Sequence, residues 1–208
     1  MSKQIEYLYR LQKKDLPKAG VVLADAFQHD PLWKEILAGS TAIQKRSTFE
    51  SPVRFCREYG EAYATSENLE GIAGWVPGTM TDITLWRLVR SGAIGLAFKA
   101  GAQVGKKVAL TFKPLKHDRE ENMKGKSFIY LLIMGVATEF QGKGFGGALL
   151  RAVISKSEQA GLPLYLETET ESNVRLYEKF GFTLVKQVII PAFNLPMWEL
   201  KRESKARS

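Results

Sequence analysis

The sequence is poor in cysteine and histidine. Cys56 is the only cysteine in 208 residues, and there are two histidines. One cysteine cannot form an intrachain disulfide, and one thiol with two imidazoles cannot supply a four-ligand structural zinc cluster. We therefore expect a fold without a metal, held together by a hydrophobic core that a chain of this length can bury.

Long hydrophobic runs are also missing. The longest apolar segment, residues 83–98, contains two arginines and is shorter than the roughly 20 residues that cross a bilayer as a helix. The first ten residues, MSKQIEYLYR, contain no apolar stretch of the secretory kind. These absences predict a soluble cytoplasmic protein with no membrane partner.

Acidic residues are outnumbered, and the excess of basic residues is concentrated in two segments. The formal net charge is +8; residues 99–126 hold seven lysines and one arginine against three acids, and residues 201–208 hold four bases against one acid. A nucleic-acid-binding surface more often interleaves bases with exposed aromatic residues, so no nucleic-acid partner is expected. We interpret the segments as a solvated loop and a frayed basic tail, with attraction of an anionic ligand as the alternative.

The hydrophobic patterning predicts a mixed α/β chain. On the face shared by Phe49 and Val53 in one helix, Cys56 is expected to be a buried small hydrophobe rather than a nucleophile. Residues 79–126 are harder to assign, and we expect one or two helices there with a mobile basic loop. Strand patterns cover residues 5–11, 62–66, 70–76, 128–137, 164–169, 182–190 and 197–201, and helix patterns cover residues 16–28, 41–58, 148–159 and 172–179.

The sharpest local signal is a glycine-rich segment between a buried strand and a helix. The segment QGKGFGG, residues 141–147, has four glycines in seven positions. Glycine permits positive φ and close approach of a ligand to the backbone, and the first turn of the following helix has unpaired N–H groups. A phosphate or pyrophosphate would fit there, with Lys143 as a cation at the rim.

Two nucleotide-binding motifs compete for this loop. Gly142-x-Gly144-x-x-Gly147 satisfies the dinucleotide fingerprint, and Glu167 follows twenty residues later. A dinucleotide domain, however, places several βαβ units after its loop, and only 41 residues follow Glu167. An NAD(P)-binding oxidoreductase is therefore a remote alternative, and a phosphate-binding NTPase loop is excluded because no G-K-[ST] ends the glycine run.

The last third of the chain resembles the GNAT superfamily of N-acetyltransferases. The strand GVATEF followed by Gln141-x-x-Gly144-x-Gly146 is similar to the acyl-CoA-binding signature Q/R-x-x-G-x-G/A of that superfamily. Thr138 stands where many relatives have proline. A further set of residues resembles the second sequence block of that superfamily, namely Glu167, Asn173, Tyr177 and Phe180-Gly181-Phe182. The resemblance is specific over residues 127–200, and residues 1–126 have a compatible order of elements.

The resemblance implies a single N-acetyltransferase domain over residues 1–208. Its fold would be an α/β (α+β) arrangement with a mixed, mostly antiparallel central sheet of six to seven strands. Helices would flank this sheet, and its central strands would splay apart. Residues 79–126 would be an insertion that could form a lid over the acceptor, and residues 201–208 a basic tail.

Acetyl-CoA is the co-substrate that the resemblance implies, and no metal is required. The pantetheine arm would run along Val136, Ala137 and Thr138 like an added strand, and Asn173 would contact the cofactor. An amide near Val136 or Ala137 would donate to the thioester oxygen. The pyrophosphate would bind the backbone amides of Gln141, Gly142, Lys143, Gly144, Phe145, Gly146 and Gly147.

Tyr177 is, by the resemblance, the general acid that protonates the departing thiolate, and it also contacts the cofactor. A phenol is protonated at neutral pH and can donate this proton; the alternative is a core aromatic residue. Tyr165, Glu167 and Glu169 share one strand face, so Glu167 or Glu169 could be the base, unless this face is simply exposed. His117 and His29 are expected to lie in a solvated loop and at a helix end.

The function expected from these features is acetyl transfer to a primary amine of a small molecule, by direct attack in a ternary complex. Acetylation of a protein or peptide and a non-catalytic acyl-CoA-binding module are the alternatives. The acceptor wall would draw on Trp33, Trp75, Trp86 and Phe98, although each of them could instead be a core residue. Assembly as a homodimer stays open.

Overall fold

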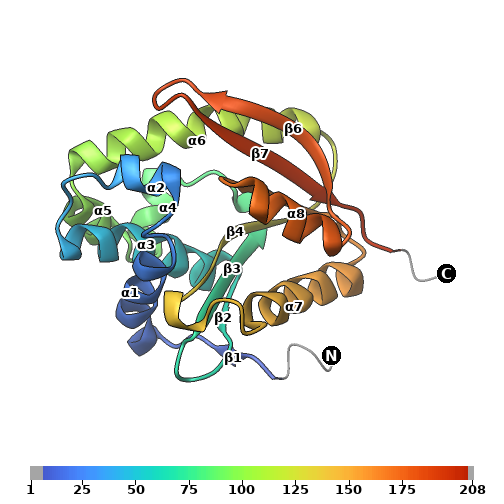
Figure 1. The fold of residues 1–208 in the computed structure, drawn as a ribbon, viewed down its shortest axis with the longest axis horizontal. Helices are drawn as coiled ribbons and strands as arrows, with labels where there is room; N and C mark the ends of the chain where they lie inside the picture. Colours follow the sequence, from blue (N-terminus) through green and yellow to red (C-terminus); the bar gives the residue numbers. More distant parts are fainter. Residues whose placement is uncertain (1–6, 206–208) are drawn as a thin grey trace.

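A seven-stranded sheet forms the centre of the computed structural model, which describes residues 7–205 (Figure 1). The spatial order is β1-β2-β3-β4-β5-β7-β6, and every neighbouring pair is antiparallel except β4 and β5. The mixed, mostly antiparallel sheet is thereby confirmed. The strands are β1 (Tyr9–Arg10), β2 (Glu61–Ala64), β3 (Gly71–Pro77), β4 (Ile129–Val136), β5 (Leu164–Thr168), β6 (Thr183–Ile190) and β7 (Leu195–Arg202).

Helices cover both faces of this sheet (Figure 1). One core includes Phe49 of α3, Leu115 of α6 and Tyr165 of β5, and the other includes Leu149 of α7 and Leu166 of β5. Short 3-10 turns lie at Lys13–Asp15, Gly78–Met80 and Thr138–Phe140. The α-helices are α1 (Leu16–Ala26), α2 (Pro31–Ile36), α3 (Ala42–Tyr59), α4 (Leu85–Arg90), α5 (Ile94–Ala100), α6 (Ala102–Asn122), α7 (Phe145–Ala160) and α8 (Glu171–Lys179).

Local capping determines where two of the early helices begin. Thr41 Oγ1 accepts from Gln44 N–H, and Gln44 Oε1 accepts from Thr41 N–H, which is a capping box at the start of α3. Asp30 accepts from the N–H groups of Leu32 and Trp33 at 2.9 and 3.0 Å. The helix end expected at His29 is therefore followed directly by a new helix, α2, with proline at its first position.

Residues 79–126 differ from the expectation. The prediction of a mobile basic loop is wrong, because this segment forms α4, α5 and the 21-residue α6. Thr111, Leu115 and Arg119 recur every four residues and are buried, so they form one inward face. The lysines of α6 lie mainly at the exposed positions between them, and His117 lies on α6 with an exposed side chain.

The ends of the chain also differ in part from the expectation. β1 covers only part of the expected first strand, and residues 5 and 6 lie outside the described residues. Arg202 is not part of a frayed tail: it ends β7, is buried, and its Nη1 lies 2.6 Å from Glu158 Oε1. Residues 206–208 lie outside the described residues. No helix between residues 7 and 205 is long and apolar enough to cross a membrane.

β4 and β5 diverge along most of their length. They pair only at Ile129–Leu164 and Tyr130–Tyr165, whereas β4 continues to Val136 and β5 to Thr168. A register irregularity opposite Gly74 and Trp75 marks a bulge in β4, and a bulge bends the strand that carries it. The expected splaying is therefore present, and it leaves the last residues of β4 without a neighbour on the β5 side.

Candidate functional site

The glycine segment connects the end of β4 to α7 through two left-handed residues. Gly142 has φ of 75° and Gly144 has φ of 88°. Gly144 is the N-cap of α7, which begins at Phe145, three residues earlier than expected. Ala148 N–H donates to Gly144 O at 3.1 Å, so helix geometry leaves the amides of residues 145–147 directed out of the helix end. Exposed amides at the positive end of a helix dipole fit a diphosphate.

Replacing Gly144 by alanine is expected to weaken acetyl-CoA binding about tenfold. A left-handed conformation costs a residue with a Cβ about 1–2 kcal/mol, so the loop relaxes and its amides move. A Cβ at Gly144 would meet nothing within 4 Å, so the cost is conformational and not steric. Gly161→Ala is the matched control, because Gly161 ends the same helix with φ of 64° and an equally open surrounding. Calorimetric Kd values that are equal for both variants would contradict the role of Gly144.

The backbone at the end of β4 points in two directions. Ala137 N–H donates to Glu70 O at 2.9 Å, toward β3, and alternation along an antiparallel ladder turns the N–H and C=O of Val136 to the opposite side. Gln141 Nε2 donates to Val136 O at 3.0 Å, consistent with this direction. Thr138 N–H donates to Asp25 Oδ2 at 2.6 Å. Of the three residues expected to pair with the pantetheine arm, only Val136 has its amide directed toward the gap in strand pairing; the amides of Ala137 and Thr138 are already bonded.

α8 positions Asn173 and Tyr177 one helical turn apart. Thr170 caps the helix by accepting from Asn173 N–H, and Asn173 Nδ2 donates to Thr168 Oγ1 at 3.0 Å, at the end of β5. Tyr177 is buried and packs on Phe182, with ring centroids 5.5 Å apart. Burial, and next the charge of Glu169, raise the pKa of Tyr177. Tyr177 is thus a core aromatic residue that also keeps its proton at neutral pH.

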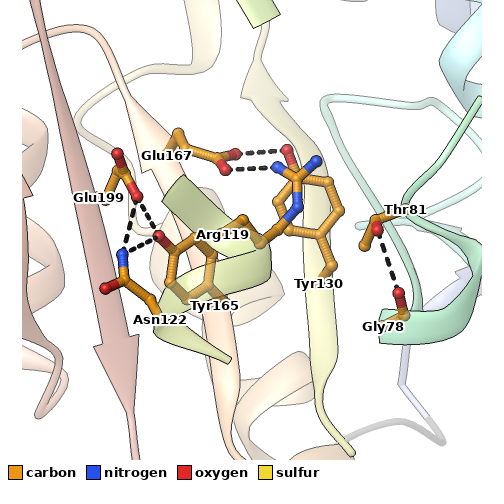
Figure 2. Close-up of polar contacts among 8 residues, drawn as sticks. All are labelled: Gly78, Thr81, Arg119, Asn122, Tyr130, Tyr165, Glu167 and Glu199. Atoms are coloured by element: carbon orange, nitrogen blue, oxygen red, sulfur yellow. Dashed lines mark hydrogen bonds and ion pairs between the residues drawn. The ribbon is translucent and has the colours of Figure 1, made fainter. Parts of the chain in front are cut away.

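Glu167 is part of a buried ion pair and does not lie on an exposed face. Its Oε1 is 2.5 Å from Arg119 Nη1, and its Oε2 accepts from the Tyr130 hydroxyl (Figure 2). The Arg119 and Glu167 side chains are only 7% and 3% exposed. Burial raises the pKa of Glu167, while Arg119 and the Tyr130 hydroxyl oppose this shift. Both carboxylate oxygens of Glu167 are occupied, so it is poorly placed to take a proton from a substrate or to bind a dinucleotide ribose.

The same network fixes α6 to the sheet. The Tyr165 hydroxyl donates to Glu199, and Asn122 Nδ2 donates to Tyr165 Oη at 3.2 Å and to Glu199 at 3.3 Å (Figure 2). Lys186 Nζ of β6 is 2.6 Å from Asp118 Oδ1 of α6. With Arg119, α6 thus contributes side chains that bond to three strands, β5, β6 and β7. We no longer expect residues 102–122 to move as a lid.

Glu169 directly follows β5 at the side where β4 and β5 diverge. Burial raises the pKa of Glu169 to about 8, the charge of Asp30 acts in the same direction, and the Trp33 indole opposes the shift. Burial likewise raises the pKa of Asp30. Glu169 in turn acts on the pKa of Tyr177. The end of β5 therefore has a protonated phenol on one side and a carboxyl group that titrates near neutral pH.

The four aromatic residues considered for the acceptor wall have different environments. Trp33 lies near Glu169, in a cluster whose other members are Phe27, Phe49 and Phe112. Trp75 is a core residue stacked on Tyr63. Trp86 and Phe98 are 67% and 79% exposed. Trp33 thus lies near Glu169, one of the two candidate bases, and Trp86 and Phe98 are not core residues.

Several contributors to the site could not be found in the sequence. Asp25 accepts from the amide of Thr138, and the charge of Asp30 raises the pKa of Glu169. Arg119 and Tyr130 bond to the two carboxylate oxygens of Glu167. Arg151 Nη1 lies 3.3 Å from the position that a Cβ on Gly147 would take, which puts a second cation beside the loop. None of these side chains belongs to a local motif, so only the tertiary structure identifies them.

Comparisons with known proteins agree with this geometry. A model of the acetyltransferase (GNAT) domain matches residues 96–184. An uncharacterized N-acetyltransferase of Schizosaccharomyces pombe is 28% identical over 209 residues, which is 96% of this chain and 84% of that protein.

Solved structures share the fold. An acetyltransferase from Corynebacterium glutamicum, described as a histone acetyltransferase and related acetyltransferase, has a TM-score of 0.63 at 20% identity and covers 97% of both chains. The polyamine N-acetyltransferase of Drosophila melanogaster has a TM-score of 0.61 at 12% identity, covering 94% of this chain and 98% of that one. Residues 96–184 thus match an acetyltransferase (GNAT) domain, and the chain over nearly its whole length is similar to an N-acetyltransferase.

Proposed function

We propose that this protein transfers an acetyl group from acetyl-CoA to a primary amine of a small molecule. The observation that carries the proposal is the convergence of three features at the diverging ends of β4 and β5. These are the outward amides at the start of α7, the Val136 amide and the buried Tyr177 hydroxyl, whose pKa is raised by burial and next by the charge of Glu169. Acetyl-CoA is the donor that the superfamily uses.

The residues at the end of β4 and the start of α7 fit such a donor. The amides of residues 142–147 bind the diphosphate, with Lys143 as a neighbouring cation, and Gln141 supports the backbone by bonding Val136 O. The Val136 N–H pairs with the pantetheine arm or donates to the thioester oxygen as negative charge develops. One preorganised donor of this kind contributes about 3 kcal/mol. Asn173 keeps the end of β5 in place through Thr168.

Proton transfers are assigned to the two groups at the end of β5. Glu169, in place of Glu167, takes a proton from the ammonium form of the acceptor, because both oxygens of Glu167 are bonded. The neutral amine attacks the thioester carbon, the C–S bond breaks, and Tyr177 gives its proton to the departing sulfur. The proton that the new amide nitrogen loses restores the Tyr177 hydroxyl. The pair of Asp30 and Glu169 carboxyls favours an acceptor with positive charge, and a relative of the same fold is named as a polyamine N-acetyltransferase.

An amine panel tests the function directly. Free CoA is measured for mono-amines, diamines and peptides, and thermal stability is measured with acetyl-CoA and with NAD. We expect stabilisation by acetyl-CoA and CoA release with small amines. Turnover of peptides alone would favour the peptide alternative. Stabilisation without any turnover would favour a binding module, and stabilisation by NAD alone would overturn the proposal.

Glu169→Gln is expected to lower kcat/KM about tenfold at pH 7. With its pKa near 8, only about a tenth of Glu169 is ionised at pH 7, which reduces the usual ~10²-fold gain from a general base. The wild-type rate should rise with pH up to about 8, because the base acts after losing its proton, and the variant should lack this limb. The titratable groups near Glu169 are Asp30, Glu167 and Tyr177. A rise of the rate with pH that persists in Glu169→Gln would show that another group is the base.

A further inference from the structure

α4 presents an apolar face that no other part of the described chain covers. Leu85 is 69% exposed, Trp86 67% and Val89 46%, and Ile83 just before the helix is 40% exposed. The spacing of about 100° per residue puts Leu85, Val89 and Trp86 within one arc of about 100° on the helix. None of the residues of α4 is buried. Most exposed hydrophobic residues occur singly, so a cluster of this kind marks an interaction surface.

The opposite side of α4 holds the helix firmly in place. Arg87 Nη1 donates to Asp82 O at 2.7 Å, and the Tyr59 hydroxyl donates to Arg87 O at 3.3 Å. Thr84 caps the helix by accepting from Arg87 N–H. At the end of α4, Ala93 N–H donates to Leu88 O at 2.9 Å and leads the chain directly into α5. The apolar side chains are therefore displayed on an anchored helix.

Basic residues predominate in the surrounding sequence, and the adjacent Asp82 is paired with Lys116 at 3.0 Å. Residues 83–117 contain seven lysines and arginines and no aspartate or glutamate. Arg90 and Lys99 are exposed, and Phe98 beside Lys99 is 79% exposed. Apolar and aromatic side chains flanked by an excess of cations are typical of helices that lie in the interface of an anionic membrane.

This surface is separate from the candidate active site. β3 leads into α4 from Pro77, which pairs with Ile129 at the first residue of β4. Val136 and the glycine loop lie at the other end of that strand. The apolar face of α4 is therefore not explained by acetyl-CoA or by the acceptor amine.

We propose that α4, with Phe98 and the adjacent cations, docks this protein on the surface of a bilayer rich in anionic phospholipid. Leu85, Trp86 and Val89 enter the headgroup region, and Arg90 and Lys99 contact lipid phosphates. A second copy of the chain is a poorer occupant, because pairing this surface with itself would bring two segments with a net positive charge together. No membrane partner was expected, because the sequence lacks a long hydrophobic run. Attachment to the surface of a bilayer does not require such a run.

Vesicle binding with tryptophan fluorescence tests the proposal. Vesicles of phosphatidylcholine alone are compared with vesicles of phosphatidylcholine and phosphatidylglycerol in equal parts, by co-sedimentation and by emission spectra. Trp75 and Trp198 are buried and Trp33 is packed among aromatic rings, so a blue shift on binding reports mainly on Trp86. We expect binding and a blue shift with the anionic vesicles, both weakened by salt.

Variants of the surface complete the test. Trp86→Ser should reduce the vesicle partition coefficient at least tenfold, and Arg90→Gln or Lys99→Gln about fivefold each. Arg90→Lys should retain binding. Leu184→Ser is the matched control, since Leu184 is 48% exposed on β6, and all of these variants should keep wild-type turnover of soluble amine.

Three results would overturn the proposal. They are failure to bind anionic vesicles, equal binding to neutral vesicles, and a monomer–dimer equilibrium that Trp86→Ser abolishes in the absence of lipid. The last result would assign the surface to a second copy. If this protein binds acidic polypeptides but not the anionic vesicles, the first of these results is obtained and the proposal is overturned.

Discussion

Tyr177→Phe is expected to lower kcat about 100-fold while the Kd for acetyl-CoA changes less than twofold. The variant removes only the hydroxyl, and the remaining ring keeps its packing on Phe182. Without the phenol the thiolate must leave unprotonated, which removes the contribution of about 10² that general acids make. Because burial and Glu169 raise the pKa of Tyr177, the wild-type acid should stay protonated across the pH range of the assay.

Tyr63→Phe is the matched control for this experiment. Tyr63 is also a buried tyrosine of the same core, and its hydroxyl donates to Glu61. That variant should keep wild-type kcat and a similar thermal stability. Measuring kcat and the calorimetric Kd for both variants separates loss of catalysis from loss of structure. An unchanged kcat in Tyr177→Phe would show that the sulfur needs no proton from this side chain.

Arg119→Met is expected to lower the free energy of unfolding by about 3–5 kcal/mol, because it leaves a buried carboxylate without its counter-ion. Arg119 and Glu167 are both almost fully buried, and their charged atoms lie 2.5 Å apart. Burial already raises the pKa of Glu167, and the loss of Arg119 raises it further. The loss in free energy of unfolding should therefore become smaller as the pH falls and Glu167 becomes neutral. Urea denaturation at several pH values measures this.

Two further variants make the result specific to the buried pair. Arg175→Met removes an exposed partner of Glu171, at 3.2 Å and within one helix, and should cost less than about 0.5 kcal/mol. Arg119→Met combined with Glu167→Gln should recover part of the lost stability, since no buried charge remains. A single variant at Arg119 as stable as the variant at Arg175 would show that α6 is not held by this ion pair.

The contacts that hold α6 on the sheet also bear on how the acceptor site is built. Because Arg119 and Asn122 hold α6 on β5 and β7, removal of residues 102–122 should damage the fold and not only the choice of acceptor. Residues 79–126 were expected to form a lid because they form a long insertion ahead of the glycine-rich segment. The buried positions of α6, four residues apart, are the feature that would have indicated a packed helix.

The sequence by itself determined the features that depend on neighbours along the chain. Residues 141–147 require glycine where φ is positive, the apolar run before them forms the central strand, and Asn173 and Tyr177 lie one turn apart on a helix. These are local consequences of backbone sterics and helix periodicity, so the mostly antiparallel fold and the superfamily could be predicted from them.

Only the tertiary structure decided which carboxylate is available and which amide is unpaired. Glu167 and Glu169 share one strand face in the sequence pattern, yet Arg119, 48 residues from Glu167, bonds to it, while Asp30 and Trp33 act on the pKa of Glu169. Asp25, 113 residues from Thr138, likewise takes the amide of that residue. Burial and charge pairing depend on contacts between distant segments, and a pattern of residues along the chain does not contain those distances.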